Sequence, residues 1–253
     1  MISPMPATTV VSTQACQPAL SPDLHPALDP MEGLKQELAL LERVVQGQQS
    51  SGVFLWRCEP SLVVPRSLCR RPGFDQASAA MQAQGWPVVV RDTGGDLTPQ
   101  APGLINIAIA FRQRRTPGAI RDSYLRLCQP LIESLANLGI EAYCASVEGA
   151  FCNGDYNLVV EGRKLAGTAQ RWRKMASHTG AAADEFAVLA HAVILCDENL
   201  AALWAAGNNF YRACDMPDRI DPGLHVSLAE LLPGSTQDLI QQSLQRFGAC
   251  LQS

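Results

Sequence analysis

The sequence predicts an α/β (α+β) fold, with helices packed around a β-sheet. Its 253 residues are enough to bury a full core, and 47% hydrophobic with 17% charged residues is the composition of a globular chain. Residues 104–111, LINIAIAF, form a nearly continuous apolar run, which is typical of a strand buried on both faces near the centre of a sheet. Residues 34–45 and 123–138 carry apolar side chains at helical spacing, so helices and strands share the chain.

The first half of the chain is expected to begin with a leader and continue with alternating elements. Residues 1–30 are rich in Pro, Ser, Thr and Ala and are expected to be a disordered leader, and residues 31–253 are expected to form a single domain. Asp29 stands where the cap of the first helix belongs, and Gly47 is expected to end that helix. The elements predicted next are a strand at 53–56, a helix at 75–84 and a strand at 87–91.

The second half is expected to contain a hairpin and to end in helices. Gly139 is expected to end the helix at 123–138. The elements predicted after it are a strand at 140–143, a hairpin of 158–160 with 165–170 around Glu161-Gly162, an apolar element at 186–195 and a helical part at about 200–253. Periodicity does not decide whether residues 186–195 are a strand or a helix.

Charge and cysteine content exclude several classes of protein. The formal net charge of −4 gives no electrostatic reason to expect nucleic acid or a membrane surface as a partner. No run of about 20 apolar residues predicts a membrane span, and no basic-flanked apolar segment predicts a signal peptide. The nine cysteines include no CxxC pair, so we expect reduced thiols and a cytoplasmic protein.

Lys164, at the start of the second hairpin strand, is the first candidate site residue. Side chains alternate along a strand, so residues 164, 166 and 168 are predicted to share one face. The small residues that follow Lys164 leave open volume, in which a ligand could present a carbonyl or carboxylate oxygen to the ammonium group. The alternative is an exposed lysine beside a turn.

Cys152, in the loop from Gly149 to Gly154, is the candidate nucleophile. Nucleophilic attack requires the thiolate, which a nearby ammonium group such as that of Lys164 would favour. Cys144 is the rival, but it follows an apolar strand and is expected to be buried. A structural role for both cysteines is the alternative, because single cysteines usually serve packing.

Three further features carry weaker signals. The segment from Arg91 to Gly95 leads a strand into two adjacent glycines, whose amide groups could bind an oxyanion or could simply form a tight turn. Five basic residues between 163 and 174 could dock an acidic partner or form a solvated face. His191 stands alone in an apolar run, so we expect a hydrogen-bonded core residue and no metal site.

Two motifs resemble the signatures of the biotin and lipoate protein ligase superfamily. PVVVRDTGGDLTPQAPGLINIAIAF, residues 87–111, is similar to its first signature, and YNLVVEGRKLAGTAQR, residues 156–171, is similar to its second. The resemblance covers roughly residues 34–200. It implies a mixed β-sheet flanked by helices, and an activity that moves biotin, lipoate or octanoate onto a lysine of a small carrier domain.

The resemblance also implies roles for individual residues. Lys164 matches the motif lysine that contacts the carbonyl or carboxyl end of the acyl group. Arg91, Gly94 and Gly95 match the segment that lines the acyl pocket, and we expect the same of two residues that follow Lys164, namely Gly167 and Thr168. The sequence departs from the family pattern at Asp96, Thr98 and Gln100, where apolar residues are usual, and at Ala192, where many relatives carry glycine.

Cys152 favours one of the two mechanisms found in this superfamily. Ligases activate a free acid with ATP and Mg²⁺, whereas octanoyl and lipoyl transferases hold the acyl group as a cysteine thioester and require no cofactor. Cys152 lies just before the second motif, as the thioester cysteine of such transferases does. We therefore expect transfer of an octanoyl or lipoyl group between an acyl carrier protein and a lipoyl-domain protein, such as the glycine cleavage H protein or the E2 subunit of a 2-oxoacid dehydrogenase. The alternatives are an ATP-dependent lipoate-protein ligase and a non-catalytic protein that binds an acyl group or a lipoyl domain.

Overall fold

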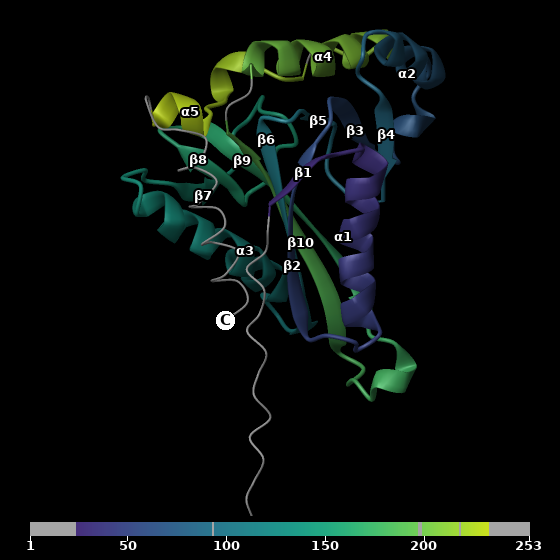
Figure 1. Ribbon diagram of the computed structural model, residues 1–253, viewed down its shortest axis with the longest axis vertical. Helices are drawn as coiled ribbons and strands as arrows, with labels where there is room; N and C mark the ends of the chain where they lie inside the picture. Colours follow the sequence, from purple (N-terminus) through teal and green to yellow (C-terminus); the bar gives the residue numbers. More distant parts are fainter. Residues whose placement is uncertain (1–23, 93, 197–198, 218, 233–253) are drawn as a thin grey trace, which may run out of the picture.

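A large mixed sheet forms the body of the protein (Figure 1). The computed structural model describes residues 24–92, 94–196, 199–217 and 219–232. The seven strands of the large sheet lie in the order β1-β2-β6-β10-β9-β8-β7. Their bounds are Leu24–Leu28 (β1), Ser51–Cys58 (β2), Leu104–Arg114 (β6), Glu185–Leu195 (β10), Arg163–Lys174 (β9), Asn157–Val160 (β8) and Tyr143–Ala145 (β7). β1 pairs with β2 in parallel and the other neighbours are antiparallel, so the sheet is mixed, as predicted.

A small second sheet and five α-helices complete the described fold. The small sheet has the order β4-β3-β5, with bounds Val88–Arg91 (β4), Ser61–Pro65 (β3) and Thr98–Gln100 (β5). The helices are Pro30–Val45 (α1), Phe74–Ala83 (α2), Ala119–Ala136 (α3), Leu200–Ala213 (α4) and Leu228–Leu231 (α5). Short 3-10 turns lie at Leu68–Arg70 (η1), Ser177–Thr179 (η2) and Pro222–Leu224 (η3). Within the described residues, no helix is long and apolar enough to span a membrane.

Strands β6 and β10 carry opposite sets of side chains to the two faces of the large sheet. On β6, Ile105, Ile107 and Ile109 pack into the core beneath α3, whereas Ala108 and Ala110 lie against α1. Small residues on the α1 face let that helix approach the sheet closely. Asn106 of β6 and His191 of β10 share the parity of the residues on the α1 face, and this brings them to the site described below.

Helix α1 begins where the sequence predicts a cap. The carboxylate of Asp29 accepts hydrogen bonds from the backbone N–H groups of Met31 and Glu32, at 2.9 and 3.2 Å. The helix ends at Val45, just before Gly47, which has a φ of 70°. Its buried stripe contains a charged residue, Glu37, where an apolar side chain would be expected.

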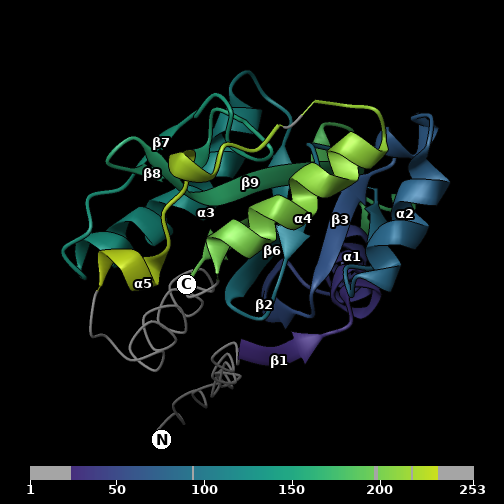
Figure 2. The same cartoon turned by 90° about the horizontal axis from the view of Figure 1, so that it is seen from above.

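The other helices cover the remaining apolar surfaces. Figure 2 shows α4 running above the strands, with α2 beside the small sheet. The buried faces of α2 and α4 share one core with β3. α3 lies against the face of the large sheet opposite α1 (Figure 1). The site described below lies between the α1 face of the large sheet and the small sheet.

Most predicted elements are present, with shifted bounds. The element at 186–195 is a strand, β10, which resolves the ambiguity of its periodicity. The strand predicted at 140–143 begins three residues later, at Tyr143 of β7, because the N–H of Ile140 still bonds back to the carbonyl of Leu135 in the turn that ends α3. β1 lies within the range predicted to be a disordered leader, and β3 and β5 were not predicted. The predicted helical part at about 200–253 contains α4 and α5, while residues 233–253 lie outside the described residues.

The predicted hairpin forms, but a bulge changes which residues share a face. Val159 pairs with Lys164 whereas Leu158 pairs with Ala166, so Leu165 is an extra residue in β9. The prediction that residues 164, 166 and 168 share one face is therefore wrong across this bulge. Ala166 packs into the core under α3, and Gly167 lies beside the Lys164 amino group instead.

Gly33 offers a test of the packing between α1 and β2. A Cβ atom at this position would overlap three ring atoms of Trp56, whose side chain is buried. Replacing glycine by alanine in a helix interior gains about 1 kcal/mol, but overpacking costs about 1–3 kcal/mol. The overlap with three ring atoms places the cost at about 2–3 kcal/mol, so we expect Gly33→Ala to lower the free energy of unfolding by about 1–2 kcal/mol in urea titrations. Lys35→Ala, on the exposed side of the same helix, should stay within about 0.5 kcal/mol of the wild type; a Gly33→Ala protein as stable as the wild type would contradict this packing.

Candidate active site

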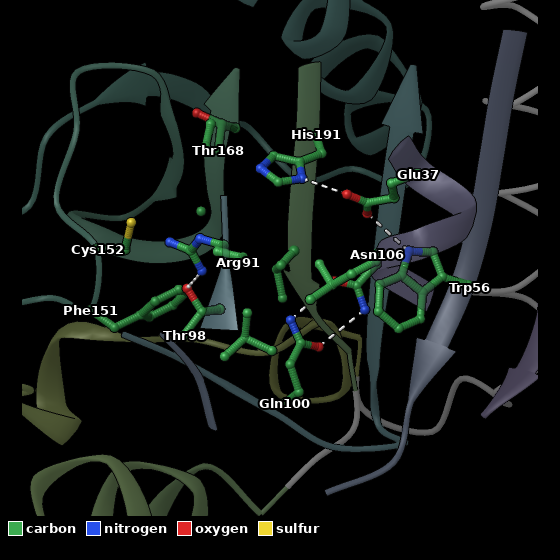
Figure 3. Close-up of a pocket in the computed structure, with 15 residues that line it drawn as sticks. Glu37, Trp56, Arg91, Thr98, Gln100, Asn106, Phe151, Cys152, Thr168 and His191 are labelled. Atoms are coloured by element: carbon green, nitrogen blue, oxygen red, sulfur yellow. Dashed lines mark hydrogen bonds and ion pairs between the residues drawn. The ribbon is translucent and has the colours of Figure 1, made fainter. Parts of the chain in front are cut away.

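A narrow cavity lies at the meeting point of α1, both sheets and the loop that carries Cys152 (Figure 3). Its volume is about 40 Å³, which is room for roughly three water molecules. The residues that line it are Leu34, Glu37, Trp56, Val63, Arg91, Thr98, Gln100, Asn106, Phe151, Cys152, Gly167, Thr168, Ala169, His191 and Val193. Of the predicted site residues, Cys152, Arg91, Gly167 and Thr168 therefore face one cavity.

Cys152 sits in a strained loop against the glycine turn. Its φ of 42° lies in the left-handed region, which is costly for a residue other than glycine. The backbone N–H of Asp96 donates to its Sγ atom at 3.3 Å. A Cβ atom on Gly95 would come within 2.7 Å of that sulfur, so a glycine is needed for the close approach. The predicted glycine segment thus contacts the thiol, although neither Gly94 nor Gly95 lines the narrow cavity.

Lys164 is fully buried directly behind this loop. Its Nζ atom donates hydrogen bonds to the backbone carbonyl of Phe151 and, at 2.9 Å, to that of Cys152. It also lies 3.9 Å from the centre of the Phe151 ring. Burial lowers the pKa of Lys164 to about 7, while the charge of a Cys152 thiolate acts in the opposite direction. The alternative of an exposed lysine beside a turn is therefore wrong.

Arg91 is buried and holds the turn that faces Cys152. Its guanidinium group donates to Thr98 Oγ1 at 2.9 Å and to the carbonyl groups of Gly94 and Asp96 at 3.1 and 2.7 Å. These bonds fix the turn in which the backbone N–H of Asp96 reaches the sulfur of Cys152. Arg91 thus lines the cavity and shapes the glycine turn at the same time.

Two pairs of polar side chains lie on the side of the cavity away from Cys152 (Figure 3). The buried carboxylate of Glu37 accepts a hydrogen bond from Trp56 Nε1 at 3.0 Å and lies 2.9 Å from His191 Nδ1. Gln100 and Asn106 exchange hydrogen bonds at 3.0 and 3.1 Å. His191 is therefore hydrogen-bonded, as predicted, and it also faces the cavity.

A second, wider cavity opens on the other side of Cys152. Its volume is about 500 Å³, and Cys152 and Phe151 line both cavities. Its other lining residues are Asp96, Glu148, Gly149, Ala150, Asn153, Tyr211, Arg219, Ile220 and Asp221. Asp96 accepts a hydrogen bond from the Tyr211 hydroxyl at 2.8 Å and lies 3.4 Å from a guanidinium nitrogen of Arg219. The thiol of Cys152 thus stands between a narrow and a wide space.

Two other predicted candidates lie apart from these cavities. Cys144 is partly exposed, where burial was expected, and a hydrogen bond from the thiol of Cys128 lowers its pKa to about 7. It lines neither cavity.

Of the five basic residues between 163 and 174, Lys164 is buried and three arginines lie against carboxylates, so the five do not form one free cationic patch. In the described part of the chain, no group of three or more His, Cys, Asp or Glu side chains is arranged to hold a metal ion.

Sequence reasoning missed three residues around the site. Glu37 could have been found, because it is a charged residue within the apolar stripe of α1. Phe151 and His225 had no periodic or motif signal, yet the N–H of Phe151 donates to His225 Nε2 at 3.2 Å. Their proximity depends on contacts between segments 74 positions apart, which no local pattern encodes.

The chain is similar to proteins of lipoyl attachment. It is 40% identical over 208 residues to an uncharacterized protein of Cupriavidus necator, across 80% of this chain and 81% of that protein. It is 31% identical over 228 residues to the octanoyl-GcvH:protein N-octanoyltransferase of Kyrpidia tusciae, across 88% of this chain and 76% of that enzyme. A lipoyl-GcvH:protein N-lipoyltransferase of Listeria monocytogenes is 25% identical over 148 residues, across 58% of this chain and 53% of that enzyme.

Solved structures with the same fold include lipoate-protein ligases. Lipoate-protein ligase A bound with ATP superposes with a TM-score of 0.66 at 16% identity, over 91% of this chain and 85% of the ligase. A putative lipoate protein ligase from T. acidophilum with bound lipoic acid gives a TM-score of 0.63 at 16% identity, with the same coverage of both chains. At this identity the likeness concerns the fold alone, and it confirms the predicted mixed sheet flanked by helices.

The family model for the lipoyl protein ligase A/B catalytic domain matches residues 29–248. This range contains both sequence motifs and both cavities beside Cys152. The match confirms the resemblance drawn from the motifs. The chain therefore belongs to the lipoyl protein ligase A/B catalytic domain family.

Proposed function

We propose that this protein transfers an octanoyl or lipoyl group between lysines of carrier domains through a thioester on Cys152. The observation that carries the proposal is the position of this thiol between two cavities. The narrow cavity is the proposed place of the acyl chain, because it lies beside the thiol and is lined by side chains of both sheets and α1, and at about 40 Å³ it has to widen to admit the chain. The wide cavity lets a lysine side chain of a carrier domain approach the same sulfur. The names of the octanoyl and lipoyl transferase relatives support this reaction and a GcvH-type partner.

In the first step Cys152 takes the acyl group from the donor. The unprotonated amine of Lys164 accepts the thiol proton, and the thiolate attacks the carbonyl carbon of the donor amide. A carbon–sulfur bond forms and the carbon–nitrogen bond breaks. The donor lysine leaves as an amine, after its nitrogen accepts the proton from the Lys164 ammonium group. Backbone N–H groups of Gly94 and Gly95 are the proposed donors to the oxyanion.

In the second step an acceptor lysine takes the acyl group from the enzyme. Its neutral amine attacks the thioester carbon, a carbon–nitrogen bond forms and the carbon–sulfur bond breaks. The proton lost by the amine passes to Lys164, and the thiolate of Cys152 is regenerated. An amide is exchanged for an amide, so the sequence of steps requires neither ATP nor Mg²⁺.

The charges of the wide cavity favour this reaction over ATP-dependent ligation. Asp96, Glu148 and Asp221 line the cavity, while Arg219 is the one cation among the described residues that line it and already lies against Asp96. Carboxylates attract the ammonium group of an approaching lysine and repel the phosphates of a nucleotide. The proposed transferase should therefore work without ATP, whereas the ligase alternative requires it.

The covalent intermediate can be detected directly. Intact-protein mass spectrometry of the wild type, mixed with an octanoylated carrier protein in the absence of ATP, should show an octanoyl adduct that hydroxylamine removes. Cys152→Ala should form no adduct, because the bond to sulfur cannot form. Cys144→Ala is the control, because it removes a different thiol that is also partly exposed. This variant should be acylated as the wild type is. An adduct that persists in Cys152→Ala and disappears in Cys144→Ala would show that Cys144 is the nucleophile, and it would contradict the proposed role of Cys152.

The role of Lys164 predicts a dependence on pH. Burial lowers its pKa to about 7, so the amine needed in the first step is scarce below this pH and abundant above it. The single-turnover rate of acyl-enzyme formation should therefore rise as the pH passes through about 7. Lys164→Met, which keeps the buried chain and removes the amine, should lower this rate by about 10²–10⁴-fold and abolish the rise. An unchanged pH profile in Lys164→Met would remove Lys164 from the proton transfer.

The charge of the wide cavity predicts an effect on partner binding. Glu148 is exposed and lines this cavity, so Glu148→Gln should raise the KM for the acceptor carrier by about 2–5-fold at low salt and leave kcat unchanged. Glu133→Gln, on the exposed side of α3, is the matched control and should change neither constant. Equal effects of the two variants in steady-state kinetics would mean that overall charge, and not the cavity, governs the encounter.

A further inference from the structure

The segment after η3 runs alongside the start of β9 and carries His225 to the back of the Cys152 loop. Lys164 and His225 form a parallel bridge, and the N–H of Val226 donates to the carbonyl of Lys164 at 3.0 Å. His225 is 3% exposed. Its ring centre lies 4.2 Å from that of Trp204 on α4 and 5.5 Å from that of Phe151. A residue remote from both sequence motifs thus packs against the residue that precedes the nucleophile.

Phe151 is held by two side chains through its backbone. Its N–H donates to His225 Nε2 at 3.2 Å, and its carbonyl accepts from Lys164 Nζ. Backbone groups of a buried loop need such partners, because an unpaired buried N–H or carbonyl is costly. The two side chains hold opposite ends of residue 151, and the next residue, Cys152, has the strained φ of 42°. A conformation of this kind persists only where its surroundings determine it.

His225 can accept this hydrogen bond because its imidazole is neutral. Burial, followed by the nearby charge of Lys164, lowers the pKa of His225 to about 4. Near neutral pH the ring is neutral, and the tautomer with its proton on Nδ1 leaves on Nε2 the lone pair that the Phe151 N–H requires. Lys164 supplies the donor and His225 the acceptor for the same residue, so the two side chains have separate functions that neither can perform for the other.

We propose that His225 is a positioning residue of the acyl transfer, because its hydrogen bond to the Phe151 N–H keeps Cys152 in the conformation in which its sulfur meets the Asp96 N–H and both cavities. This inference rests on the proposed function of Cys152. Loss of the acceptor frees the Phe151 N–H and lets Cys152 relax toward an ordinary φ. His225 does not itself line the narrow cavity and reaches it through Phe151, so no direct contact with the acyl chain is removed and we expect the chemical step to be slowed.

Two substitutions separate the hydrogen bond from the packing. His225→Phe keeps an aromatic ring between Phe151 and Trp204 and removes the acceptor. His225→Gln keeps an acceptor oxygen and removes the ring. We expect His225→Phe to lower kcat by about tenfold or more with an unchanged KM, since a buried donor is left unpaired. His225→Gln should recover kcat to within about threefold of the wild type, because its amide oxygen can accept from the Phe151 N–H.

A second readout is independent of the acyl substrate. Peptide mass spectrometry after timed iodoacetamide treatment measures the alkylation rate of Cys152, with Cys144 as an internal reference in the same protein. His225→Phe should slow alkylation of Cys152 alone, because the sulfur loses its contact with the Asp96 N–H. His178→Phe, at an exposed histidine of η2, is the control and should match the wild type in both assays.

The outcomes distinguish the proposal from its alternatives. A normal kcat in His225→Phe would overturn it, and so would an equal loss in His225→Phe and His225→Gln, which would make the ring's packing the cause. If the wild type itself transfers no acyl group, the proposed function fails. Alkylation then decides the positioning role alone, with an unchanged Cys152 rate in His225→Phe as the contradicting result.

Discussion

The buried amino group of Lys164 is the contact on which the arrangement around Cys152 depends. A lysine side chain is rarely buried completely unless it is paired, because its ammonium group loses hydration. Here the backbone carbonyls of Phe151 and Cys152 and the ring of Phe151 replace water. They replace it incompletely, and burial lowers the pKa of Lys164 to about 7. The same burial therefore fixes the loop and leaves an amine able to exchange protons near neutral pH.

The remainder of the site follows from what surrounds this contact. The bulge in β9 turns Gly167 toward the amino group, and a Cβ atom at that position would lie 3.0 Å from the Phe151 ring and crowd it. On the far side of the loop, Arg91 shapes the glycine turn whose Asp96 N–H meets the sulfur of Cys152. The loop is thus held by the buried amine of Lys164, and the thiol that it carries is held by the backbone N–H of Asp96. The thiol stays open to one narrow and one wide cavity, as the proposed two-step transfer requires.

The sequence predicts the parts of this structure that have local signals. The apolar run at 104–111 and the cap at Asp29 identify β6 and α1, and the second motif identifies Lys164 before any contact is known. The bulge at Leu165 is not predicted, because it depends on how two strands register. β3 and β5 are short and contain proline, which weakens the pattern of a strand. The residues Asp96, Thr98 and Gln100 read as departures from the family pattern, and their side-chain partners explain them: Tyr211 and Arg219 for Asp96, Arg91 for Thr98 and Asn106 for Gln100.

A crystal structure of the protein after reaction with an octanoylated carrier and removal of that carrier would show directly whether Cys152 holds the acyl group. We expect electron density continuous from the Sγ of Cys152 into an acyl chain, with the chain in the narrow cavity beside Thr168 and the thioester carbonyl near the glycine turn. The φ of Cys152 should remain positive, with Lys164 still bonded to the two carbonyl groups. An acyl chain bonded to another residue, or one that lies in the wide cavity with the narrow cavity unchanged, would rule out the proposed thioester site.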